Sequence, residues 1–156
     1  MSARAEPVEA RAGTGGGLLR HVVFRVGSER YALPLEAVRE VVVPQPPFAR
    51  VPRCPDAVRG AMNLRGRVVA VVDLAQLVGL PPQRLEPAAS QVLILDHGKR
   101  ALGLLIGGVV GVEALEGPAD AGRELVRGVA ASRTGAVTLL AAGPLVEQAT
   151  RLFGAA

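Results

Sequence analysis

The side chains that could carry out catalysis are few in this chain and far apart in its sequence. Its only histidines are His21 and His97 and its only cysteine is Cys54, so no nucleophile has a base nearby in the sequence. Asp73 and Asp96 are also well separated, and no second group that could serve as a general acid accompanies either of them. Without such a constellation we predict that the protein is not an enzyme and has no small-molecule substrate.

Residues that could hold a metal or a cofactor are equally sparse. One cysteine and unclustered carboxylates do not make the ligand set of a metal site. Residues 13–17 are rich in glycine but lack the lysine, the preceding strand and the following helix of a phosphate-binding loop. Gly103, Gly107, Gly108 and Gly111 recur without the strand-to-helix context of a dinucleotide-binding fingerprint. We therefore expect neither a metal nor a cofactor.

The net charge of +4 comes almost entirely from arginine, since Lys99 is the only lysine. Such an excess is compatible with nucleic acid, an anionic surface or an acidic protein as the partner. The arginines are scattered singly, and the few aromatic residues provide no series of platforms on which bases could stack. A protein partner is therefore favoured over nucleic acid. A basic domain that contacts DNA or an anionic surface remains as an alternative, which a steep salt dependence of DNA binding would support.

The polar residues that point most clearly to a binding role lie in Gly60-Ala61-Met62-Asn63-Leu64-Arg65-Gly66. The apolar residues 68–72 follow, and this run predicts a strand that is buried on both faces. Beside a core strand, Asn63 could bond the backbone of the loop or meet a partner. Arg65 has the same two alternatives, because its guanidinium could pair with a carboxylate of this chain or of another protein.

This stretch carries a recognisable signature, G-x-x-N-L-R-G followed by V-D-L. The signature consists of Gly60, Asn63, Leu64, Arg65, Gly66, Val72, Asp73 and Leu74. It resembles CheW-like adaptor domains, which couple chemoreceptors to the CheA histidine kinase, and the resemblance covers roughly residues 20–150. It implies a mainly all-β fold of two packed five-stranded Src-homology-3-like β-barrels with a short C-terminal helix.

The resemblance also assigns roles to individual residues. Val38-Arg39-Glu40-Val41 matches the family pattern V-x-E-[IV], whereas the sequence alone favours an exposed strand carboxylate as the role of Glu40. Pairing of Arg65 with Glu40 is a structural alternative to direct contact with a partner. The candidate partner-binding residues are Val38, Glu40, Gly60, Asn63 and Arg65. The residues expected to support the motif structurally are Gly66, Asp73 and Leu74.

The partners that the resemblance implies are the cytoplasmic tip of a chemoreceptor, the regulatory domain of a CheA-type kinase, and other CheW-like domains. Expected localisation is cytoplasmic, in arrays of membrane-bound or soluble receptors. The chain departs from the family pattern at Ala70, Gly107-Gly108, residues 116–124 and Ala141-Ala142-Gly143. Because most of these departures lie in the second half, which contributes a kinase contact in the family, an adaptor that binds receptor but has weakened or lost kinase binding is an alternative.

The elements that must position these residues are short strands separated by glycine- and proline-rich turns, a pattern typical of small barrels. A hairpin around Gly27 is echoed by a second one around Gly98, 71 residues later, which indicates an architectural repeat. Residues 1–17 are expected to form a disordered tail and residues 18–156 a single domain. We place the first subdomain at about residues 35–90. We place the second at about 91–142, completed by strands from the N-terminal segment, and the final helix at 143–153.

Overall fold

A computed structural model of the chain describes residues 17–97, 100–117 and 124–154. Almost all of the expected disordered tail (1–17), Gly98 of the second hairpin and most of the loop 116–124 therefore lie outside the described residues. The strands are β1 (Leu18–Val26), β2 (Glu29–Pro34), β3 (Glu40–Val42), β4 (Val58–Leu64), β5 (Arg67–Asp73), β6 (Gln91–His97), β7 (Arg100–Ile106), β8 (Gly108–Glu116), β9 (Val126–Ser132) and β10 (Gly135–Leu140). The helices are η2 (Leu35–Ala37), α2 (Leu74–Leu77) and α3 (Ala142–Gly154).

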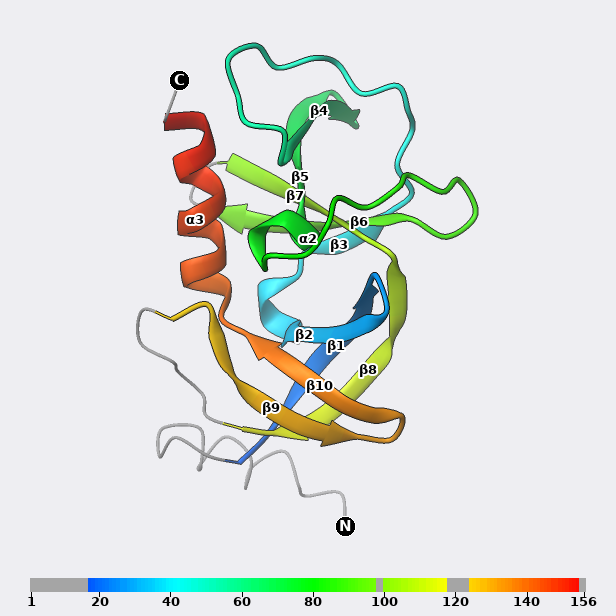
Figure 1. Cartoon of the computed structure of the whole chain (residues 1–156), viewed down its shortest axis with the longest axis vertical. Helices are drawn as coiled ribbons and strands as arrows, with labels where there is room; N and C mark the ends of the chain where they lie inside the picture. The colour runs from blue at the N-terminus through cyan, green and yellow to red at the C-terminus, as the bar shows by residue number, and fades with distance from the viewer. Residues whose placement is uncertain (1–16, 98–99, 118–123, 155–156) are drawn as a thin grey trace.

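The strands form two five-stranded sheets, which confirms the mainly β fold with a short C-terminal helix (Figure 1). The first lobe has the strand order β3-β6-β7-β5-β4 and contains the signature. The second lobe has the order β8-β1-β2-β10-β9. Helix α3 runs along the side of the first lobe in Figure 1, starting at the end of β10. No helix in the described part of the chain is long and apolar enough to span a bilayer.

The division between the lobes is not where the sequence analysis placed it. Strands β6 and β7, residues 91–106, pair with β3 and β5 in the first lobe instead of opening the second. The first lobe is thus a continuous insertion between β2 and β8, and β8 crosses to the second lobe to pair with β1. Apolar periodicity indicates where a strand lies but not with which strand it pairs. The sequence therefore did not show that the chain passes from the first lobe to the second after Ile106.

Three apolar clusters hold this arrangement together. A small cluster fills each lobe, around Val23 and Leu139 in the second and around Val71 and Ile94 in the first. The largest cluster lies between the lobes and contains residues of both sheets and of helices α2 and α3. Successive side chains of a strand point to opposite faces. Each central strand therefore contributes to two cores, and the lobes share one buried interior.

The expected internal repeat is present in the topology. A hairpin, a strand that crosses to the other lobe and a second hairpin occur as β1–β5 and again as β6–β10. The backbone repeats in detail: Asp73 N donates to Ala57 O at 2.7 Å, and Ala141 N donates to Leu125 O at 2.8 Å. In both copies the strand before the turn begins with Val-Arg-Gly, and its register slips at that glycine.

The buried run 68–72 was predicted correctly only in part. Val69, Val71 and Val72 are buried, but Val68 is 80% exposed. Val68 lies one residue after the start of β5, beside the hairpin turn and outside both apolar cores. The apolar run in the sequence therefore does not show at which residue of the strand the side chains become buried.

Candidate partner-binding site

The signature residues form the tip of the β4–β5 hairpin. Leu64 pairs with Arg67, leaving Arg65 and Gly66 as a two-residue turn with φ of 50° and 87°. Positive φ at both central residues is typical of the type I′ turn, whose twist matches that of the flanking strands. Asn63 Oδ1 accepts a hydrogen bond from Gly66 N at 2.8 Å, which is the structural role considered for Asn63. The turn thus holds Arg65 outward at a conformation that non-glycine residues rarely adopt.

The guanidinium of Arg65 forms an ion pair with Glu40 on the edge strand β3. This is the pairing within the chain that the sequence analysis gave as the structural alternative to contact with a partner. The side chain of Arg65 is nevertheless 65% exposed, and that of Glu40 is 26% exposed. A hollow of about 110 Å³ lies at this pair and is also lined by Arg39, Arg67 and Ile94. The pair therefore joins the hairpin tip to the sheet edge while leaving most of the arginine available to another molecule.

The second lobe contains a comparable pair. Arg133 at the β9–β10 turn donates its backbone N to Glu113 Oε1 at 3.2 Å, and its Nε lies 3.9 Å from the same oxygen. Glu113 belongs to β8, which is the edge strand of that sheet. Each lobe is thus fastened by an arginine at a hairpin tip and a glutamate on an edge strand.

Gly60 has a structural role that explains why glycine stands there. Its φ is 140°, and a Cβ at this position would lie 2.5 Å from Phe48 Cβ and 2.7 Å from Ala49 O. Ala49 pairs with Ala61 next to it, so the segment before β4 packs backbone against backbone. Gly60 therefore supports the hairpin from its base, and its Cα faces this segment of the same chain.

Asp73 is fully buried and organises the other end of the hairpin. Its carboxylate accepts bonds from Arg59 Nη1 at 3.1 Å, Ala75 N at 3.0 Å, and Gln83 N and Nε2 at 2.9 and 2.7 Å. The bond from Ala75 caps helix α2, and Leu74 beside it is fully buried. Asp73 and Leu74 are therefore structural, whereas the sequence analysis did not identify Arg59 and Gln83 as the partners of Asp73.

Val38 lies apart from the other candidate residues. It is half-buried after helix η2 and packs against the apolar cluster between the lobes. Its neighbours Ala37 and Arg39 line a hollow of about 430 Å³, here called the interlobe groove. The groove is lined by Glu36, Ala37, Arg39, Leu95, Asp96, Ala142, Gly143 and Val146. Asn63, Arg65 and Glu40 therefore lie at the hairpin tip, Val38 lies next to the lining of this groove, and Gly60 is buried at the base of the hairpin.

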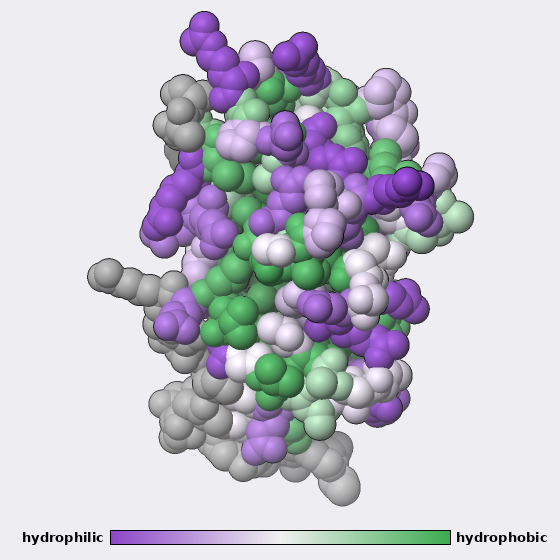
Figure 2. All heavy atoms as spheres, viewed as in Figure 1, coloured by the Kyte–Doolittle hydropathy of each residue, from purple (hydrophilic) through white to green (hydrophobic). Residues whose placement is uncertain are grey.

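Apolar side chains also reach the surface where the lobes meet. Figure 2 shows hydrophobic residues gathered across the middle of one face, with polar residues around them. Arg39 and Asp96, which line the interlobe groove, form an ion pair of 3.0 Å and are about half exposed. Sequence reasoning missed this pair because its members are 57 residues apart, and Arg39 directly precedes β3 while Asp96 lies on β6, two strands whose pairing was not predicted.

A buried polar pair lies inside the second lobe. His21 is 1% exposed, its Nδ1 donates to Leu19 O at 2.7 Å, and its Nε2 lies 2.7 Å from Arg127 Nη2. Arg127 Nε donates to Leu140 O at 3.0 Å. Burial lowers the pKa of His21, the charge of Arg127 lowers it further, and the hydrogen bond to Leu19 O raises it.

Within the described residues, no group of three or more acidic, histidine or cysteine side chains is arranged to hold a metal.

Comparison with known proteins decides the family. The CheW-like domain family matches residues 20–149, which is most of the chain. The chain belongs to this family. A probable chemotaxis protein CheW of Rhizobium etli is 34% identical over 89 residues, which are 56% of each chain. Chemotaxis protein CheW of Helicobacter pylori is 32% identical over 89 residues, 57% of this chain and 53% of its own.

The fold of this CheW-like chain is also found in a solved structure. The scaffolding protein TtCheW from Thermoanaerobacter tengcongensis has a TM-score of 0.64, with 24% sequence identity over 79% of this chain and 88% of that chain. By contrast, this chain spans about half the length of the curated relatives it matches. The fold and the family are therefore established.

Proposed function

We propose that this CheW-like chain is a non-catalytic cytoplasmic adaptor that couples chemoreceptor tips to the regulatory domain of a CheA-type histidine kinase. The observation that carries the proposal is the exposed Arg65 at the hairpin tip, held by Glu40 at the family's own signature. Family membership supports the pathway. The presence of two separate surfaces, the hairpin tip and the interlobe groove, supports a coupling role, because an adaptor must hold two partners at once.

The hairpin tip is the surface we assign to the kinase. Arg65 offers a planar guanidinium with five donors, and Arg67 and the exposed Val68 lie beside it on β5. A charged group next to an exposed apolar residue is the composition expected of an interface hot spot with a polar rim. Because Glu40 occupies one side of the guanidinium, the remaining donors can bond an acidic or carbonyl group of the partner.

The interlobe groove is the surface we assign to the receptor. Its apolar lining residues are Ala37, Leu95, Ala142 and Val146, its volume is about 430 Å³, and charged Glu36 and Arg39 border it. An amphipathic helix that lays its apolar face in such a groove is a common mode of recognition. We therefore take the segment of the chemoreceptor tip that binds here to be a helix of this kind.

Titration of the full-length protein against the kinase regulatory domain tests the first surface. We expect Arg65→Glu to weaken binding at least about tenfold, roughly the loss of one good charged contact. Arg84→Glu makes the same charge change on an exposed loop elsewhere and should leave binding unchanged. The double variant Arg65→Glu with Glu40→Arg restores the internal pair with reversed charges. Rescue by the double variant would mean that Arg65 acts by positioning the tip, and no rescue would mean direct contact.

Titration against the receptor tip tests the second surface. Gly143 lines the interlobe groove, has ordinary φ, and a Cβ there would meet nothing within 4 Å. Gly143→Arg should therefore fill the groove without disturbing the fold and abolish receptor binding, whereas Gly143→Ala should preserve it. Unchanged receptor binding by Gly143→Arg would contradict the assignment of the groove.

The same titrations decide the second candidate, an adaptor with weakened kinase binding. One departure from the family pattern supports this candidate. Ala141 occupies the position that corresponds to Asp73 in the first copy of the internal repeat. The second lobe therefore lacks an equivalent of the buried carboxylate that orders the end of β5 in the first lobe. Receptor binding without kinase binding would favour this candidate. If neither partner binds, the adaptor proposal fails.

A further inference from the structure

The two halves of this chain depend on each other for every sheet of more than two strands. We define the N-terminal half as residues 17–77, with β1–β5, and the C-terminal half as residues 91–154, with β6–β10. Among the residues that the structure describes, strands of the same half pair with one another only as the hairpins β1–β2 and β4–β5, or β6–β7 and β9–β10. The pairs β1–β8, β2–β10, β3–β6 and β5–β7 all join one half to the other. An isolated hairpin is at best marginally stable in water, so neither half can form a lobe alone.

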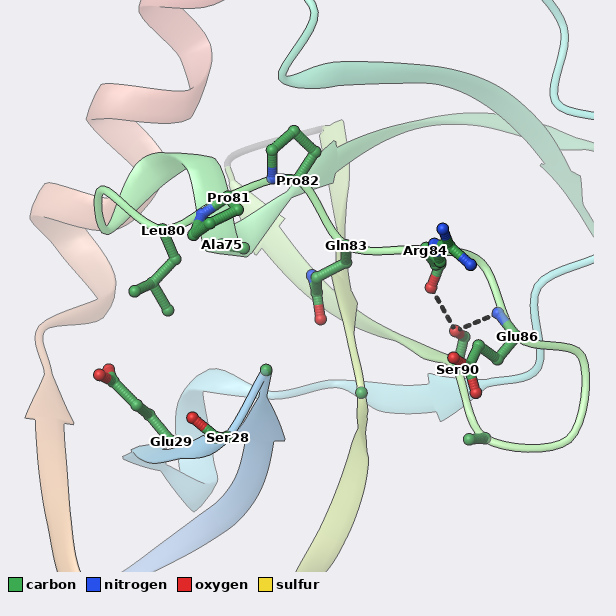
Figure 3. Close-up of a pocket in the computed structure, with 13 residues that line it drawn as sticks. Ser28, Glu29, Ala75, Leu80, Pro81, Pro82, Gln83, Arg84, Glu86 and Ser90 are labelled. Atoms are coloured by element: carbon green, nitrogen blue, oxygen red, sulfur yellow. Dashed lines mark hydrogen bonds between the residues drawn. The ribbon is translucent and has the colours of Figure 1, made fainter.

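The connector, residues 78–90, joins the halves; Val78, Leu80 and Leu85 pack against the apolar clusters, and the rest of it is largely exposed. Pro81, Pro82 and residues 86–89 are exposed. A hollow of about 440 Å³ lies between the connector and the β1–β2 turn, Gly27 to Glu29 (Figure 3). Near its end, Glu86 N donates to Ser90 Oγ at 2.8 Å, a bond within the connector itself. Extending the whole connector would release Val78 and Leu80 from the cluster between the lobes and Leu85 from the cluster of the first lobe. A chain of this length reaches roughly 40 Å when extended.

One residue of the connector bonds both halves. Gln83 Nε2 donates to Asp73 Oδ1 in the N-terminal half and to Leu105 O in the C-terminal half, both at 2.7 Å. Gln83 O accepts from Arg59 Nη1 at 2.8 Å. Gln83 is thus a latch that ties the connector to its own two halves.

We propose that two copies of this chain exchange their C-terminal halves through the connector, so that each lobe is completed by the second copy. The partner is a second copy because it alone supplies the same complementary strands and the same apolar cores. Such a dimer keeps all four strand pairings between halves and gives up the contacts of the connector, namely the bonds of Gln83 and the packing of Val78, Leu80 and Leu85. The proposal does not depend on which receptor or kinase the protein binds.

Refolding of the full-length protein from urea at low and high protein concentration tests the exchange, with mass measured by light scattering after size exclusion. Gln83→Ala should yield several-fold more dimer than the wild type at high concentration. Gln45→Ala, the same change on another exposed loop, should match the wild type. Equal dimer fractions for Gln83→Ala and Gln45→Ala would show that the bonds of Gln83 do not restrain the connector.

A protease site inserted between Ala88 and Ala89 separates exchange from ordinary dimerisation. Cutting the connector of an exchanged dimer releases particles of monomer mass, each made of two halves, whereas an ordinary dimer keeps its mass. We expect release to monomer mass with an unchanged circular dichroism spectrum. A dimer mass that survives complete cutting would overturn the proposal, and so would refolding that gives only monomer for every variant at every concentration.

Discussion

At Gly60 the backbone leaves no room for a methyl group. Gly60→Ala would force Cβ against Phe48 and Ala49 O and retain an unfavourable positive φ. We expect a loss of at least about 2 kcal/mol in the free energy of unfolding, measured by urea titration followed by circular dichroism. Gly143→Ala makes the same change at an open site in α3 and should stabilise by up to about 1 kcal/mol. Equal effects of the two changes would contradict this account.

His21 makes the stability of the second lobe depend on pH. Its pKa in the folded protein is lowered, by burial first, from the ordinary value of 6.5. The unfolded chain therefore takes up the proton first. The contribution of neutral His21, bonded to the cation of Arg127, is complete above about pH 6.5 and is lost as the pH falls through the folded pKa. Glu113, opposite His21 on β8, is the acidic residue nearest in register.

A variant isolates this effect from other titrating groups. His21→Gln retains an acceptor for Arg127 but does not titrate. The free energy of unfolding should fall more for the wild type than for His21→Gln between about pH 7.5 and about pH 5.5. An identical fall in both proteins would show that His21 does not contribute.

At the scale of elements, helix α3 lacks the cap that the internal repeat provides for α2. Asp73 caps α2 through Ala75 N, and the equivalent position before α3 is Ala141, which is 7% exposed. Ala141→Asp would place an acceptor at the start of α3, with Arg127 at the position that Arg59 has in the first copy. We expect a gain of about 1 kcal/mol in the free energy of unfolding. Ala142→Asp, one residue later, should raise the free energy of unfolding by less. Destabilisation by Ala141→Asp would show that the internal repeat does not extend to the positions of these side chains.

The sequence predicted most elements because their signals are local. Turn residues at Gly27 and at Arg65-Gly66 mark hairpins, and Pro144 with the apolar spacing that follows marks α3. The signature also led to the hairpin tip, where Arg65, Asn63 and Glu40 do lie together. The lobe boundary, Gln83 beside Asp73 and the pair of His21 with Arg127 were not predicted. They depend on contacts between segments far apart in sequence, which neither composition nor periodicity encodes.

At the scale of the whole molecule, the shared interior couples the stability of the lobes. Phe24 on β1 is fully buried in the cluster between them. Phe24→Ala should cost about 3 to 5 kcal/mol and lower amide-exchange protection in β6 and β7 of the other lobe as much as in β1 and β2. Val129→Ala, on a side chain that is 68% exposed, should change stability by less than about 0.5 kcal/mol. Loss of protection in one lobe alone would show that the lobes unfold independently.

The insertion of the first lobe into the second sets an order of events during synthesis. Strands β3 to β7 leave the ribosome as a continuous stretch, so the first lobe can close while translation continues. Strands β1 and β2 are made earlier and can pair with each other, but their remaining partners β8 and β10 follow only roughly 5 to 20 s later at usual elongation rates. The oldest strands of the chain are therefore among the last to be enclosed, and their apolar faces must stay soluble in the interval.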